Sequence, residues 1–136
     1  MEAAIIVPVL ALLGFGAADG AWLFVQTHRL EAGLTAGGSY LAQTRAAAAD
    51  EQRARNVAVF GEFAPGGSPR IPGWRAADVS IAYRTVANTS GQYRNAGDVR
   101  VARLESTLPY RGLGVLSGLR GEPVALSASF ETRITP

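Results

Sequence analysis

The sequence predicts an α+β protein in which one long N-terminal helix packs on a small antiparallel β-sheet. Residues 3–25 form an almost uninterrupted apolar stretch, and the later part of the chain alternates apolar with polar residues as strands do. A chain of 136 residues holds one domain and an appendage, because an ordinary core needs roughly 100 to 150 residues. We therefore divide the chain into a transmembrane and assembly helix (1–27), its amphipathic continuation (28–55) and a β-rich head (56–136).

The apolar stretch has the length that a helix needs to cross about 30 Å of hydrocarbon. A cleaved secretory signal is the competing interpretation, but its apolar region usually spans about 7 to 15 residues and follows positive charge. This stretch is longer and follows Glu2. Trp22, His28 and Arg29 at its far end predict an anchor at the membrane interface.

The helical spacing continues beyond the apolar stretch, because Leu30, Leu34 and Leu41 share one stripe. We therefore expect a single helix over residues 3–53, on the order of 75 Å long at 1.5 Å per residue. Pro8 removes one backbone hydrogen bond and predicts a bend. Small residues spaced four apart suit close helix contacts, either with another helix or with the protein's own domain. They are Gly16, Gly20, Gly33 and Gly37.

The head is expected to be a sheet of about four antiparallel strands, covered on one face by the second half of the helix. Turn-forming residues at 65–73 and 88–91 separate the alternating segments. Leucines spaced three apart within residues 109–121 predict a short amphipathic helix or turn. The predicted strands are residues 56–63, 78–86, 98–108 and 123–134.

Composition argues against most kinds of chemistry. The chain has no cysteine, no lysine and one histidine, His28, so it lacks the residues for thiolate or Schiff-base catalysis and for histidine-based metal clusters. Its net charge is +2 and its arginines are scattered, which is not a nucleic-acid footprint. Gly112, Gly114 and Gly118 miss the spacing of a dinucleotide- or phosphate-binding loop. The sequence predicts a protein that is not an enzyme and needs neither cofactor nor metal.

Two acidic residues stand out because of their positions. An ionised carboxylate within an apolar helix costs several kcal/mol unless it is paired or hydrated, so Asp19 is a candidate for charge pairing in an assembly. Hydration of Asp19 at the far interface is the alternative. Glu2 precedes the apolar stretch, where it would lie among headgroups in a monomer and could neutralise a cationic group of a neighbouring chain in an assembly.

Several short segments resemble the TadE/TadG-like minor pilins, or pseudopilins, of tight-adherence (Flp, type IVc) pili. They are residues 2–10, Asp19 before an aromatic residue, residues 26–41, and the closing segments 99–104 and 124–133. The resemblance implies a bacterial inner-membrane protein with a periplasmic head, processed by a prepilin peptidase before it enters a pilus or the pilus base. Glu2 would match the family's early glutamate, which is thought to pair with the N-terminal amine of an adjacent subunit. The sequence begins Met1-Glu2 without the family's basic leader, so we keep two expectations: a leader trimmed upstream, or an unprocessed protein.

We therefore predict a structural minor pilin or pilus-assembly component, acting in cell adhesion. Its partners would be other pilus subunits, through the N-terminal helix, and membrane lipid, but not nucleic acid. The alternative is a membrane-tethered periplasmic binding domain whose helix is a passive anchor. A soluble enzyme with a buried N-terminal helix is a third and weaker interpretation, because such helices rarely run this long without a polar face.

Overall fold

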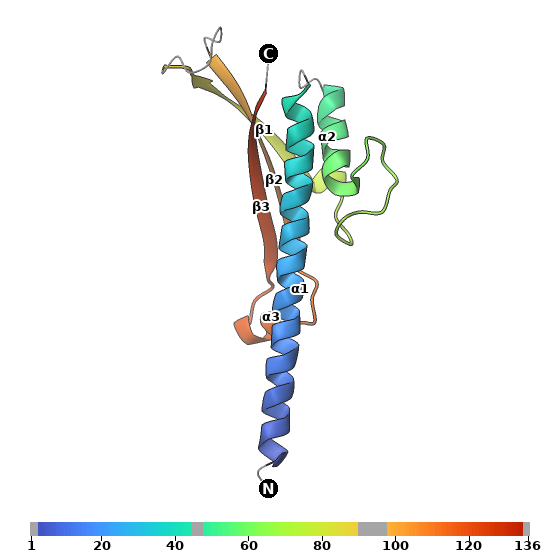
Figure 1. Cartoon of the computed structure of the whole chain (residues 1–136), viewed down its shortest axis with the longest axis vertical. Helices are drawn as coiled ribbons and strands as arrows, with labels where there is room; N and C mark the ends of the chain where they lie inside the picture. The colour runs from blue at the N-terminus through green and yellow to red at the C-terminus, as the bar shows by residue number, and fades with distance from the viewer. Residues whose placement is uncertain (1–2, 45–47, 90–97, 135–136) are drawn as a thin grey trace.

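The computed structural model describes residues 3–44, 48–89 and 98–134 (Figure 1). The described residues form two long helices, a three-stranded sheet and two short helices. In chain order the elements are α1 (Ala3–Ala42), α2 (Ala48–Phe60), the 3₁₀ helix η1 (Ala76–Asp78), β1 (Val79–Ala87), β2 (Asp98–Pro109), α3 (Val115–Arg120) and β3 (Ala125–Ile134). The predicted α+β architecture, with a long apolar helix packed on an antiparallel sheet, is confirmed.

The helix α1 is the axis of the molecule. Its 40 residues extend about 60 Å at 1.5 Å per residue, and its N-terminal part projects well beyond the head (Figure 1). Pro8 lies inside α1, and Figure 1 shows no sharp kink in this part of the helix. The remaining part of α1 lies along the sheet, as the leucine stripe predicts.

The prediction of one helix over residues 3–53 is wrong. The first helix ends at Ala42, and α2 begins at Ala48 and runs back beside α1 in the opposite direction (Figure 1). Gly33 of α1 faces Ala58 of α2, and Gly37 faces Ala54 one turn away. The reversal allows the two helices to pack against one another. The second half of α1 lies on the sheet, and α2 reaches β1 through the hydrogen bond that Tyr83 donates to Glu51.

The predicted strand at 56–63 is also wrong, because residues up to Phe60 belong to α2. The run from Asn56 to Phe60 alternates like a strand, but it is the end of a helix whose buried residues are Ala54, Asn56, Ala58 and Val59. The apolar ones, Ala58 and Val59, follow Ala54 by four and five residues, as the face of a helix requires. The sheet therefore has three strands instead of four.

The other three predicted strands are confirmed within two residues at each end. All pairs are antiparallel in the order β1-β2-β3; for example, Leu104 of β2 faces Ile81 on one side and Phe130 on the other. Alternate residues of β2 are buried from Ala102 to Leu108, so here one face of the sheet lies on the helices and the other is open to solvent. The predicted turn at 88–91 lies partly outside the described residues.

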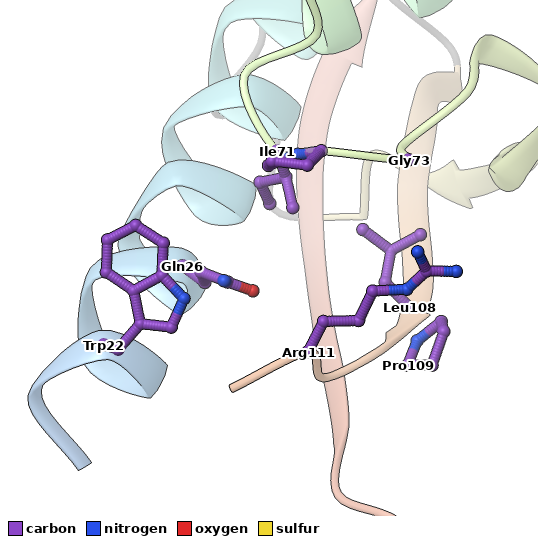
Figure 2. A pocket seen from close by; sticks show the side chains of 8 residues that line it. Trp22, Gln26, Ile71, Gly73, Leu108, Pro109 and Arg111 are labelled. Carbon is purple, nitrogen blue, oxygen red and sulfur yellow. The ribbon is translucent and has the colours of Figure 1, made fainter. Parts of the chain in front are cut away.

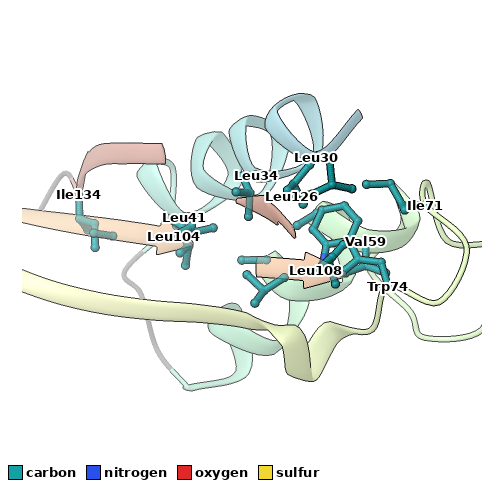
Figure 3. Close-up of a cluster of buried hydrophobic side chains, with 14 residues drawn as sticks. Leu30, Leu34, Leu41, Val59, Ile71, Trp74, Leu104, Leu108, Leu126 and Ile134 are labelled. Carbon is teal, nitrogen blue, oxygen red and sulfur yellow. The ribbon is translucent and has the colours of Figure 1, made fainter. Parts of the chain in front are cut away.

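The core lies between the two helices and the inner face of the sheet (Figure 3). Trp74, from the loop between α2 and η1, is 1% exposed, and its indole N–H donates a 3.1 Å hydrogen bond to the Ser106 hydroxyl. That hydroxyl in turn donates to the Asp78 carbonyl oxygen at 2.8 Å. The buried apolar side chains are Leu30, Leu34, Leu41, Ala54, Ala58, Val59, Ile71, Trp74, Val79, Ala102, Leu104, Leu108, Leu126 and Ile134.

Candidate functional site

The N-terminal part of α1 carries an uncovered band of large apolar side chains, which we call the apolar band. Every member is more than half exposed. Apolar surface of this extent on a soluble monomer is unusual and marks an interface with a membrane or with another protein. The helix, taken from Ile6 to Ala42, is long and apolar enough to cross a membrane. The members of the band are Ile6, Val7, Val9, Leu10, Leu12, Leu13 and Phe15.

Aromatic and basic side chains gather on α1 above the apolar band. The rings of Phe24 and His28 stack with their centroids 5.3 Å apart, and the guanidinium of Arg29 lies 6.0 Å from the centre of the Trp22 ring. All four residues are exposed. Of the residues from which the sequence predicted an interfacial anchor, Trp22 and Arg29 thus form one pair, and His28 pairs with Phe24 within the same two turns of α1.

Asp19, the acid inside the apolar stretch, is completely buried by the head. The Tyr110 hydroxyl lies 2.6 Å from the Asp19 carboxylate and 2.7 Å from its backbone carbonyl oxygen. The backbone N–H groups of Leu113 and Leu116 donate to the two carboxylate oxygens at 2.9 and 3.0 Å. We call this group of contacts the Asp19 clamp. It joins the N-terminal helix to the connection between β2 and β3.

The local sequence explains how the clamp closes. Gly112 lies so close to the Asp19 carboxylate and the Tyr110 hydroxyl that an added Cβ would overlap both. Gly114 precedes α3 and Gly121 follows it, both with positive φ (85° and 70°), which side chains disfavour. A tyrosine hydroxyl has an ordinary pKa of about 10 and is protonated at neutral pH, so Tyr110 can donate to the Asp19 carboxylate.

The clamp gives Asp19 a different partner from the one expected. The sequence predicted pairing with another subunit or hydration, whereas the carboxylate is held by groups of its own chain. No pattern in the sequence connects residue 19 with residues more than 90 positions later. The head also contacts α1 from Gly16 upwards, which is well before the boundary placed after residue 27.

The four glycines predicted for helix contacts have different surroundings. Gly33 and Gly37 lie against α2, where an added Cβ at Gly37 would be 2.7 Å from a carbonyl oxygen. Gly16 lies beside Val115, and Gly20 has no neighbouring side chain within 4 Å of an added Cβ. Gly33 and Gly37 therefore allow α1 and α2 of the same chain to pack closely. Glu2, the other predicted pairing residue, lies outside the described residues.

A small cavity lies beside the clamp, between α1, the Pro72-Gly73 loop and the end of β2 (Figure 2). Its volume of about 120 Å³ is well below the roughly 300 to 1,000 Å³ of ordinary small-molecule sites. Gln26 is only 4% exposed and points towards Arg111 across this space (Figure 2). Within the described part of the chain, no group of three or more His, Cys, Asp or Glu residues is placed to hold a metal ion.

Comparisons of the chain with protein-family models, with curated proteins and with solved structures found no match. The functional inferences below therefore depend on the geometry of the helix, the clamp and the head.

Proposed function

We propose that this protein is a structural minor pilin or pilus-assembly component, held in the bacterial inner membrane by α1 and assembled through that helix, with its head in the periplasm. The observation that carries the proposal is the apolar band, which the head leaves uncovered. Full burial of one such side chain contributes roughly 1.5 to 3 kcal/mol. Covering the band with lipid, and later with helices of neighbouring subunits, is therefore strongly favoured.

The packing of α1 into the core of the head favours a role of the helix in assembly over a role as a passive anchor. A tethered binding domain needs only a flexible connection to its anchor, whereas here the upper part of α1 forms part of the head's own core through Leu30, Leu34 and Leu41. The Asp19 clamp adds a further attachment one helical turn below Trp22. A head fixed in this way transmits its orientation to the band, as a subunit of an ordered assembly requires.

The clamp also changes the expected roles of the two acids. Asp19 holds the head to the helix, so the proposal assigns pairing between subunits to Glu2 alone. Processing by a prepilin peptidase belongs to the same proposal, because it would expose the amino group that such a glutamate pairs with in an assembly.

An exchange of the band tests the proposal. Residues 3–18 except Gly16 are replaced by an unrelated apolar helix of equal length, which leaves Asp19, the contact between Gly16 and Val115 and all later contacts in place. In the native host, we expect the exchanged protein to remain in the membrane fraction but to be lost from filaments sheared off the cell surface. The matched control replaces only Gly14 by alanine, since no atom lies within 4 Å of an added Cβ there.

Recovery of the exchanged protein in filaments at the unmodified level would refute assembly through the helix and favour the tethered binding domain. Recovery of the unmodified protein in the soluble fraction would refute membrane anchoring itself.

A further inference from the structure

The connection between β2 and β3 lies beside α1 at a depth where the helix is apolar on its outer surface. Val115 contacts α1 at Gly16, next to exposed Phe15. Exposed apolar residues continue on α1 above this contact, where Phe24 is 67% exposed and Val25 is also uncovered. The residues 3–25 extend about 35 Å at 1.5 Å per residue, which matches the roughly 30 Å hydrocarbon core of a bilayer. Lipid that covers the exposed apolar residues of α1 therefore also reaches this connection.

The outer surface of the connection is itself apolar. Leu113 and Leu119 are 64% and 69% exposed. Arg111 and Arg120 flank the two leucines and are exposed as well. Long basic side chains next to apolar ones suit the boundary of a bilayer, because the stems remain in the apolar region while the guanidinium groups reach the phosphates.

Five backbone N–H groups of this segment have hydrogen-bond partners within the protein. The N–H groups of Leu113 and Leu116 bond to Asp19. Those of Tyr110, Gly118 and Gly121 bond to carbonyl oxygens at 2.8, 2.9 and 2.9 Å. Irregular backbone at membrane depth is tolerated only where its polar groups have such partners. These groups therefore need no water in order to be satisfied.

We propose that residues 110–121, which we call the α3 foot, lie in the boundary of the same bilayer that holds α1, with Leu113 and Leu119 against lipid and Asp19 enclosed between foot and helix. This proposal rests on the membrane anchoring proposed above. The foot covers the one acidic side chain of the apolar stretch, so that lipid does not meet the carboxylate. It also sets the depth at which the head sits.

Site-directed spin labelling of the full-length protein tests the foot. The chain contains no cysteine, so a single label can be attached in each of the variants L119C, L113C, F15C and S129C. Phe15 is the reference within the apolar band, and Ser129 is an exposed residue on the outer face of β3. Each protein is placed in phosphatidylcholine–phosphatidylglycerol vesicles at about one protein per vesicle. Collisions of the label with oxygen, which concentrates in lipid, are compared with collisions with a water-soluble nickel complex.

We expect the labels at 119, 113 and 15 to favour oxygen and the label at 129 to favour nickel. If 119 and 113 behave like 129 while 15 favours oxygen, the helix is in lipid and the foot is not, which overturns this inference alone. If 15 also favours nickel, the proposed anchoring fails. Labels at 119 and 113 that are shielded from both reagents would show that protein covers the foot, and this too would overturn contact with lipid.

Discussion

The substitution of Asp19 by asparagine keeps the size of the side chain and removes its charge and one acceptor. In the clamp each carboxylate oxygen accepts from a backbone N–H, that of Leu113 at 2.9 Å and that of Leu116 at 3.0 Å. An asparagine offers one oxygen and one NH₂ group, so one of these amides must face a donor. We therefore expect Asp19→Asn to loosen the α3 foot without unfolding the core.

The size of the effect follows from the buried amide that loses its acceptor. Leaving a buried donor unsatisfied costs about 1 to 3 kcal/mol, which is roughly a 5- to 150-fold change in an equilibrium constant. Because amide exchange follows local opening, deuterium uptake by the peptide 110–121 should accelerate by a similar factor. Hydrogen–deuterium exchange with mass spectrometry, on the full-length protein in detergent micelles, measures it directly.

A second perturbation of the clamp and a matched control complete this experiment. Gly112→Ala should loosen the same peptide, since an added Cβ overlaps the Asp19 carboxylate and the Tyr110 hydroxyl. Asp98→Asn makes the same chemical change at an exposed position at the start of β2 and should leave the peptide unchanged. Unaltered exchange in Asp19→Asn would refute the view that the carboxylate holds the foot to the helix.

Other predictions concern the packing of the head. Gly37→Ala places a Cβ 2.7 Å from a carbonyl oxygen of α2 and should lower the free energy of unfolding by about 1–3 kcal/mol, whereas Gly14→Ala should not lower it. Trp74→Phe removes a buried hydrogen bond and core volume, and should cost about 1–3 kcal/mol in a denaturant titration. Burial and the hydrogen bond to Glu51 raise the pKa of Tyr83 from 10.0 to about 12. The folded protein then holds this proton more tightly than the unfolded chain, so stability should be intact below about pH 10 and fall as the pH rises towards 12.

Each of these predictions has a control and a contradicting outcome. Equal stability of Gly37→Ala and Gly14→Ala would mean that α1 and α2 are not in close contact. Trp22→Phe changes an exposed indole, and a cost as large as that of Trp74→Phe would contradict the placement of Trp74 in the core. Tyr83→Phe should remove part of the alkaline loss of stability. An unchanged pH profile would contradict the raised pKa of the partly buried Tyr83.

The reversal between α1 and α2 is a feature that the sequence did not predict. The segment from Gln43 to Ala49 contains neither glycine nor proline and favours a helix, so nothing local predicts the break after Ala42. The tertiary reason is the fit of Gly33 and Gly37 to the backbone of α2. The matching spacing of Ala54 and Ala58 was a usable signal, because pairs of small residues four apart on two segments suit close antiparallel packing.

The three strands of the sheet and the long apolar helix up to Ala42 were predictable because they depend on periodicity within one segment. The clamp was not, because it joins Asp19 to groups 91 to 97 residues away, two of which are backbone amides that any residue supplies. The sequence could show that an acid in an apolar helix needs partners. Only the fold shows which groups supply them.

The distance along the chain between the two halves of the clamp has a consequence for biosynthesis. Asp19 leaves the ribosome 97 residues before Leu116, which at 5 to 20 residues per second is a delay of about 5 to 20 s. During this time α1 carries a carboxylate that no part of the nascent chain can yet enclose. Closure of the clamp is thus a late event, and the head must be almost fully synthesised before the helix can take its final place.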